Sequence, residues 1–291
     1  MANELPWKFI QNIRDHATRQ GEEIALAYAL REPPIDPFFI VREEGCIHAE
    51  GGDLADAFDG CLEYVGSGRF LLAFNTKYNQ WTHSGDHHPK VRFTVAHELG
   101  HYFRDEHRKI LKNGGSPLTC TTEFTADFQM EQEADCFAAG LLMPSQLLAP
   151  IVNDEPEPTL ATVRQVASDF DVSLTSMLVR WVRLSDFPCA IFAIKDGKIN
   201  WGCVSEALAK RGAFRKIRGP VSSREAQTFS RSGTGHYREG KGLGLLGQWV
   251  ETDANVSVSE HYAAIPYANH ILCFLTAPED EFASRDWDDD D

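Results

Sequence analysis

The 291-residue sequence lacks several features that would place it in a familiar class of protein. It has no run of about 18 consecutive apolar residues, and no basic start followed by an apolar stretch near the N-terminus. We therefore expect a soluble, intracellular protein of the cytoplasm with no membrane partner. Its 7 cysteines form no C-x-x-C pair, which argues against a disulfide framework or a zinc ribbon and indicates reduced thiols.

Basic charge is also scarce. The chain has 28 Lys and Arg against 43 Asp and Glu, a net charge of −15. Nonspecific binding to nucleic acid draws on clustered basic residues, so this balance argues against a direct nucleic-acid partner. The glycine-rich stretch 230–247 lacks the G-x-x-x-x-G-K-[ST] pattern and predicts a flexible loop rather than a nucleotide site.

What the sequence does contain is an H-E-x-x-H box inside an apolar, helix-compatible stretch. On one helix, His97 and His101 share a face, so both imidazoles can bind one Zn²⁺ while Glu98 flanks the ion as a general base. Pro89, just before the box, suits the start of a helix. The alternative is a pair of histidines on an ordinary helix, but the small and apolar neighbours favour a buried active-site helix. The box predicts a zinc metallopeptidase.

A catalytic zinc ion needs a third protein ligand, and residues 130–144 offer one. This stretch reads as a second helix that ends before Pro144. Glu131 and Asp135 share a face, so Glu131 could bind the metal while Asp135 accepts a hydrogen bond from a ligand imidazole. Glu133 points elsewhere and is the fallback ligand if the helix is rotated. A solvated acidic face would be the better interpretation of an isolated E-x-E-x-D run, but not of one that follows this box.

These two segments resemble the ImmA/IrrE metallopeptidase family. Residues 92–103 read R-F-T-V-A-H-E-L-G-H-Y-F, and residues 131–144 read E-Q-E-A-D-C-F-A-A-G-L-L-M-P. The family typically shows R-F-T-L-A-H-E-L-G-H, then a short insert, then E-x-E-A-[ND]-x-F-A-A-x-L-L-M-P. The insert in this chain is somewhat longer than is usual.

The resemblance implies a compact α/β peptidase unit. It also implies a zinc or manganese ion bound by His97, His101 and Glu131, with Glu98 as the catalytic acid and base. Residues 70–75 resemble the strand ending in Asn that precedes the box in this family, and could form the edge on which an extended substrate lies.

Other histidines near the box are open candidates. His83, His87 and His88 lie in a polar loop and could reach the site or bind a second metal, but a solvated loop is the favoured interpretation. His107 could line the cleft near the end of the helix, but a surface histidine is the favoured interpretation. The sequence identifies no group that stabilises an oxyanion.

The fold class that we predict is α+β: a zincin-like metallopeptidase domain with an active-site helix and a small sheet, a short helical segment, and a C-terminal α+β domain. The C-terminal domain occupies the position at which an IrrE-like protein carries a GAF-like sensor. The helical segment resembles a helix-turn-helix but carries few basic residues, so packing is its favoured duty. The predicted boundaries are 1–150 for the peptidase domain, 151–185 for the helical segment, 186–280 for the C-terminal domain and 281–291 for an acidic tail.

The expected elements follow from periodicity and turn residues. Besides the two site helices, they are a helix over 6–30 with a break near Gly21, strands at 38–41 and 69–74 with a short helix between them in 51–64, helices at 159–170 and 173–184, a hairpin of 188–194 with 198–201, and strands at 255–265 and 270–275.

Two functions remain open at this point. The first is a regulatory endopeptidase acting on one protein substrate, which in this family is most often a helix-turn-helix repressor, in a stress, mobile-element or defence response. The second is a regulator that uses the metal structurally and acts by binding other proteins without proteolysis. The intact Glu98 favours catalysis, because a structural metal site does not need a general base.

Overall fold

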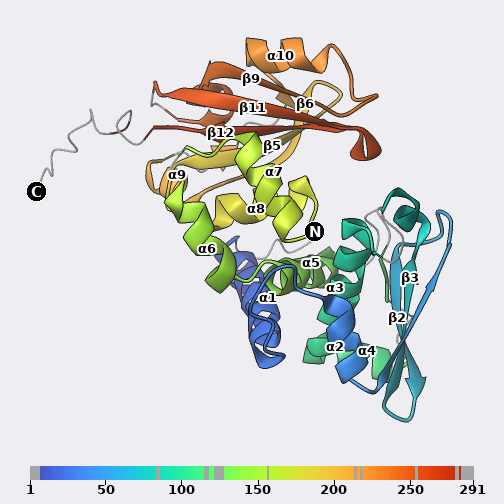
Figure 1. Cartoon of the computed structure of the whole chain (residues 1–291). Coiled ribbons are helices and arrows are strands. Elements are labelled where there is room, and N and C mark those ends of the chain that lie inside the picture. The colour runs from blue at the N-terminus through green and yellow to red at the C-terminus, as the bar shows by residue number, and fades with distance from the viewer. Residues whose placement is uncertain are drawn as a thin grey trace, which may run out of the picture. The chain divides into compact units, whose positions relative to one another are not determined.

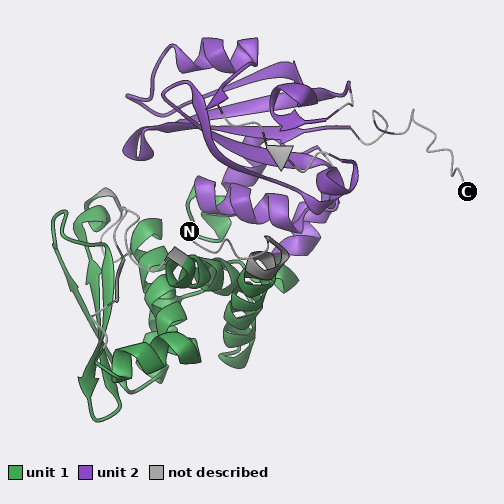
Figure 2. Ribbon diagram, turned by 180° about the vertical axis from the view of Figure 1, so that it is seen from behind, with its two compact units in different colours: residues 1–147, 167–173 green, residues 148–166, 174–291 purple. Residues whose placement is uncertain are grey.

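The computed structural model describes most of the chain as two compact units (Figure 2). The first unit comprises 1–147 with 167–173, and the second comprises 148–166 with 174–291, so the predicted helical segment is divided between them. Most of the predicted acidic tail, and His83, lie outside the described residues. The described residues are 7–82, 86–114, 118–120, 128–155, 157–212, 215–216, 219–252, 255–278 and 282.

The first unit packs helices on a small sheet, as Figure 1 shows. Its elements are α1 (Trp7–Ala27), α2 (Pro37–Glu43), β1 (Ile47–Gly52), β2 (Gly60–Gly66), β3 (Arg69–Asn75), η1 (Lys77–Trp81), α3 (Pro89–Phe103), α4 (Asp105–Lys112), β4 (Leu118–Cys120) and α5 (Phe128–Leu142). Helix α1 packs on α5, α5 packs on α3, and α3 packs on β2 and β3. The two helices predicted for the site therefore lie side by side, with α3 between α5 and the sheet.

Close contact between α1 and α5 depends on glycine. A Cβ atom at Gly140 would collide with the backbone carbonyl of Thr18, and one at Gly21 would collide with the carbonyl of Phe137. Helix α1 runs unbroken through Gly21, so the predicted break there is wrong. This glycine admits the neighbouring helix and does not end its own, because a buried contact outweighs the low helix propensity of glycine.

Two short elements before the site differ from the prediction. The strand predicted at 38–41 is helix α2, which begins with Pro37 and is capped by the carboxylate of Asp36, 2.9 Å from the amide nitrogen of Phe38. A four-residue apolar run fits a strand or a buried helix equally well, and here the cap at Asp36 favours the helix. The short helix predicted within 51–64 is also wrong, because β1 ends at Gly52, β2 begins at Gly60, and the residues between them form turns.

The strand predicted at 69–74 is confirmed as β3, but its predicted position at a sheet edge is wrong. The strand order is β1-β3-β2-β4, with β1 parallel to β3 and the other pairs antiparallel. Strand β1, with the sequence I-H-A-E-G-G, pairs with β3 on the side opposite β2, so β3 has no free edge. Its polar and glycine residues have low strand propensity, so the sequence alone does not predict this strand.

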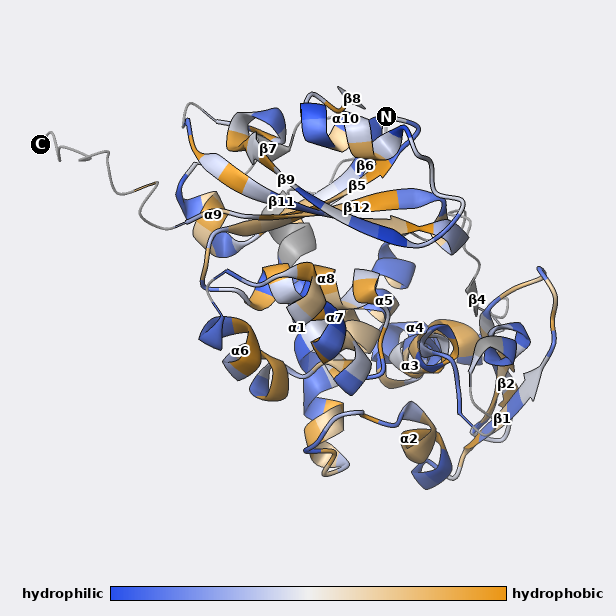
Figure 3. Ribbon diagram, turned by 45° about the horizontal axis from the view of Figure 1, so that its top comes forward, coloured by the Kyte–Doolittle hydropathy of each residue, from blue (hydrophilic) through white to orange (hydrophobic). Residues whose placement is uncertain are grey.

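The second unit is built on a six-stranded sheet with the order β8-β6-β5-β12-β11-β9. Its central strands β5 and β12 are each buried over six consecutive residues, and they are strongly hydrophobic in Figure 3. Its other described elements include α8 (Leu174–Leu184), α9 (Glu206–Lys210), β7 (Arg215–Lys216), α10 (Arg224–Ser230), η2 (Leu246–Gln248), β10 (Val250–Glu251) and η3 (Pro266–Ala268), while α6 (Ser145–Asp154) and α7 (Leu160–Asp169) cross the unit boundaries. The sheet strands are β5 (Cys189–Lys195), β6 (Lys198–Val204), β8 (Gly219–Pro220), β9 (Arg238–Leu245), β11 (Ser257–Ile265) and β12 (His270–Thr276).

Most predictions for this part of the chain are confirmed. The helices predicted at 159–170 and 173–184 are α7 and α8. The predicted hairpin is β5 and β6, and its turn residues Asp196 and Gly197 have the positive φ angles of 51° and 70° that such a turn requires. The predicted strands at 255–265 and 270–275 are β11 and β12.

The glycine-rich stretch is not wholly a loop, because residues 238–245 form strand β9. A Cβ atom on Gly240 would lie 2.8 Å from the Phe229 ring, and one on Gly242 would lie 2.8 Å from the side chain of Glu225. Both contacts are with α10, so the glycines let this strand lie flush against the helix. The prediction of a flexible loop is wrong for this segment.

In the part of the chain that the structure describes, no single helix has the length and apolar character of a membrane span. The pair Gln129–Leu142 and Ser145–Asp154 reaches that length and composition only together, across a bend of 74°.

Candidate metal centre

Helix α3 presents the H-E-x-x-H box to helix α5. The side chain of His88 caps α3 by accepting a hydrogen bond from the amide of Lys90 at 3.1 Å, and Pro89 occupies the first turn. Gly100 lies against α5, where a Cβ atom would be 3.1 Å from the Cα of Ala134. The small residue lets the two helices approach closely, and this brings the carboxylates of α5 within reach of the histidines of α3.

Three potential metal ligands converge between these helices. The Nε2 atoms of His97 and His101 are 3.1 Å apart. The Glu131 carboxylate lies 3.2 Å from Nε2 of His97 and 3.5 Å from Nε2 of His101, and one donor atom from each residue lies within 4.8 Å of the others. Both histidines are 1% exposed, whereas the Glu131 side chain is 30% exposed, so the cluster reaches the surface on the side of α5.

The protonation states of these groups suit a cation. Burial lowers the pKa of His101 to about 4, which leaves its imidazole neutral. Burial raises the pKa of Glu131, but its contacts with His101 and His97 outweigh that effect and lower the pKa to about 2. Two imidazoles and one carboxylate form a donor set that suits Zn²⁺.

The Glu98 side chain is fully buried beside this cluster. Neither of its carboxylate oxygens has a hydrogen-bond partner among the described residues. Burial raises its pKa to about 8, with the Glu131 charge adding to the rise and His97 opposing it. Strand β2 begins directly against this side chain, since a Cβ atom at Gly60 would lie 2.7 Å from Oε1 of Glu98. A buried carboxylate without a donor fits a site that also takes up a cation and the water that the carboxylate would contact.

The outer nitrogens of the two histidines have different partners. Nδ1 of His97 lies 2.9 Å from the carboxylate of Asp135, as the sequence predicts for an orienting residue. Nδ1 of His101 lies 3.0 Å from Nδ1 of His107, a contact that the sequence analysis did not anticipate. His107 is 1% exposed, so the interpretation as a surface histidine is wrong.

Glu133, the fallback ligand, lies outside the three-residue cluster. It forms an ion pair with Arg104, lies 3.3 Å from Nε2 of His107, and accepts a hydrogen bond from Gln129 at 2.9 Å. Burial raises its pKa, but His107, Gln129 and Arg104 together lower it to about 2. The structure thus places Glu131 next to both histidines of the H-E-x-x-H box, whereas Glu133 lies beside Arg104 and His107.

The remaining candidates have other roles. The ring of His87 stacks on Phe38 with 4.1 Å between the ring centroids, and His88 caps α3. The hydroxyl of Tyr102 donates a hydrogen bond to Glu44 at 2.5 Å and is 2.9 Å from the sulfur of Cys46, so Tyr102 faces the core. None of these three is in the cluster of His97, His101 and Glu131.

Sequence reasoning missed Gly60, Arg104 and the inward orientation of His107. Arg104 and His107 follow the end of α3, where the chain turns into α4, so helical spacing from the box does not place them. Gly60 lies on a strand with no sequence signal of its own. The nearest available signal was the presence of one more histidine and one arginine soon after the box.

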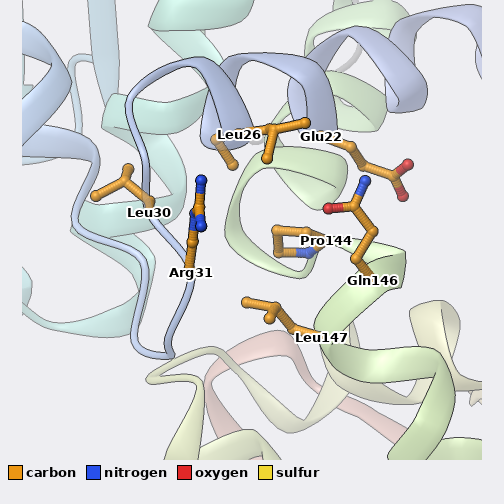
Figure 4. A pocket seen from close by; sticks show the side chains of 8 residues that line it. Glu22, Leu26, Leu30, Arg31, Pro144, Gln146 and Leu147 are labelled. Carbon is orange, nitrogen blue, oxygen red and sulfur yellow. The ribbon is translucent and has the colours of Figure 1, made fainter.

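A surface pocket of about 420 Å³ in the first unit is separate from this cluster (Figure 4). Its lining includes Leu26, Leu30 and Leu147 with the charged residues Glu22 and Arg31. The Glu22 carboxylate accepts a hydrogen bond from the amide of Ser145 at 3.1 Å, which ties α1 to the start of α6. No member of the metal-ligand cluster lines this pocket.

The chain is similar to known proteins in one segment of its sequence and in its fold. Residues 82–182 match a peptidase family model described as the IrrE N-terminal-like domain, which confirms the resemblance over that segment. The structure is similar to one titled Mycobacterium tuberculosis transcriptional regulator, with a TM-score of 0.56 and 9% sequence identity. That match covers 97% of this chain and 98% of the other, and at this identity it shows a shared fold alone. No curated protein matches the sequence.

Proposed function

We propose, from the premise that residues 82–182 form an IrrE N-terminal-like peptidase domain, that this chain is a zinc-dependent endopeptidase with a regulatory role. The observation that carries the proposal is Glu98, a fully buried carboxylate with no described hydrogen-bond partner, beside the potential ligands His97, His101 and Glu131. A structural metal site would not need such a residue, because a buried carboxylate without a partner costs stability. Catalysis explains why it is there.

His97, His101 and Glu131 would hold the ion, and Asp135 would keep the ring of His97 in place. When bound, zinc supplies Lewis acidity, which activates water near neutral pH and polarises the scissile carbonyl. Manganese is the alternative ion. Glu98 would accept the proton of the attacking water at a carboxylate oxygen and then deliver it to the nitrogen of the leaving amine. The absence of a Cβ atom at Gly60 keeps the space beside Oε1 of Glu98 free for this exchange.

The substrate that we propose is a helix-turn-helix repressor, cleaved in a stress, mobile-element or defence response. The fold likeness to a protein titled a transcriptional regulator supports a role in transcription. We also propose that the second unit is a GAF-like sensor domain, because it follows the peptidase unit and its described part is an antiparallel sheet with helices. The six described free thiols favour a reducing compartment such as the cytoplasm.

The test is identification of new protein N-termini in a native lysate incubated with metal-loaded chain, in parallel with Glu98→Ala. We expect a few cleavages, on one substrate, with the original chain alone, while both proteins bind one equivalent of zinc. Equal N-termini in both samples, with metal bound in both, would instead support the regulator that acts by binding. Many unrelated cleavages would indicate a degradative protease and contradict the regulatory role.

A further inference from the structure

A continuous series of buried polar groups extends from the metal cluster into the first unit. It starts at Nδ1 of His101, which lies 3.0 Å from Nδ1 of His107. The other ring nitrogen of His107 lies 3.3 Å from a carboxylate oxygen of Glu133, and that carboxylate is paired with Arg104. All four side chains are buried, with Glu133 only 6% exposed. Solvent therefore does not compete for these contacts.

The hydrogen bonds of this series can all run in one direction, from His101 through His107 to Glu133. Arg104 holds the Glu133 carboxylate in its ionised form, and an ionised carboxylate can only accept. Nε2 of His107 therefore donates to Glu133, and a His107 ring whose proton is on Nε2 offers Nδ1 as an acceptor. Nδ1 of His101 is left as the donor to His107.

This order determines the tautomer of His101. With its proton on Nδ1, the lone pair of the ring is on Nε2. That is the nitrogen that lies 3.1 Å from Nε2 of His97 and 3.5 Å from Glu131. In this arrangement the buried series presents Nε2 of His101, the nitrogen with the lone pair, to the cluster.

We propose that His107 and Glu133 are positioning residues that hold His101 in its metal-binding tautomer and orientation. The inference rests on the proposed metal site and deepens the proposed function. His97 has a simpler arrangement, since its partner Asp135 has a side chain that is 58% exposed, and water can replace it. Of the two supports, the one behind His101 is buried and the more costly to remove.

The direct test is the zinc affinity of the metal-free full chain, measured by competition with a chelator. His107→Phe keeps the bulk of the ring but removes the acceptor for His101, and should weaken zinc binding about 10- to 100-fold. His107→Asn restores an acceptor oxygen near the same place and should recover part of that loss. Glu133→Gln keeps the shape of the side chain and removes its charge, and should weaken binding less than His107→Phe. The matched control is His48→Asn, which changes an exposed histidine on β1 and should leave the affinity unchanged.

A second readout separates positioning from general damage. The visible absorption spectrum of the Co²⁺-loaded protein reports ligand geometry and should change in His107→Phe and Glu133→Gln but not in the control. Circular dichroism of the metal-free proteins checks folding, and if His107→Phe does not fold, Glu133→Gln decides alone.

Affinities within twofold of the original, with unchanged cobalt spectra, would overturn the inference. These readouts do not depend on cleavage. An original chain that binds zinc but cleaves nothing would remove the proposed peptidase and leave this result valid, whereas an original chain that binds no zinc would overturn both.

Discussion

Glu98 is the residue whose substitution tests the structure most sharply, because its burial should make the metal-free protein less stable as the pH rises. Its pKa is about 8 in the folded chain, against an ordinary value of 4.5. A folded pKa above the unfolded one means that stability is fully present below pH 4.5 and is lost as the pH rises toward 8. Glu98→Gln cannot ionise and escapes this loss.

The magnitude follows from the pH interval. At pH 7 the unfolded chain has released the Glu98 proton while the folded chain retains it, which corresponds to about 3 kcal/mol in favour of Glu98→Gln. At pH 5 the difference should fall below about 1 kcal/mol. Amide hydrogen exchange of α3 and α5 peptides, in the full chain with a chelator present, measures the opening free energy of the first unit at each pH.

The matched control is Glu131→Gln, which should act in the opposite direction. The pKa of Glu131 is lowered to about 2, so its charge stabilises the fold above the unfolded pKa of about 4.5, and this stabilisation is lost as the pH falls toward 2. Because its side chain is partly exposed, the loss at pH 7 should be about 1–2 kcal/mol after allowance for solvent screening. A Glu98→Gln protein no more stable than the original at pH 7, or a gain that does not change with pH, would refute the burial of an unpaired carboxylate.

Three further predictions follow from close contacts and from the second unit. Gly140→Ala should lower the stability of the first unit by about 1–3 kcal/mol in amide exchange, because its Cβ meets the backbone of Thr18; a gain, as at an open helix position, would contradict the helix contact. The added Cβ in Gly60→Ala should displace the Glu98 side chain, so this variant should still bind zinc in equilibrium dialysis but turn over peptide about 100-fold more slowly. Full activity would show that the open space beside Glu98 is not needed. Burial raises the pKa of Glu260, so stability of the second unit should be lost as the pH rises; thermal melts of Glu260→Gln should depend less on pH, and parallel melting curves would contradict this.

Much of the fold could be predicted from the sequence wherever periodicity or a turn was strong. The α7 and α8 helices carry apolar residues at helical spacing, and the Asp196–Gly197 turn fixes the hairpin of β5 and β6. The errors occurred where a distant partner decides the structure. Strand β1 pairs with β3 although its own sequence favours no strand, and Gly21 continues a helix because α5 lies against it. Local propensity does not contain that information.

In the candidate site, too, some residues could be placed from the sequence, and others depend on partners far along the chain. Helical spacing alone places His97 with His101 and Glu131 with Asp135, because residues four apart share a face. It also separates Glu133 from Glu131, in agreement with the structure, where the two carboxylates face different histidines.

His107 is different, because the chain leaves the helix at Arg104 before reaching it. Its place beside His101 depends on the angle between α3 and α4 and on the buried charge of Glu133, which contacts both Arg104 and His107. The residues that would bind the ion, and Asp135 beside His97, follow from a helical repeat of about 3.6 residues per turn. The residues that would orient His101 depend on tertiary packing, which no repeat encodes.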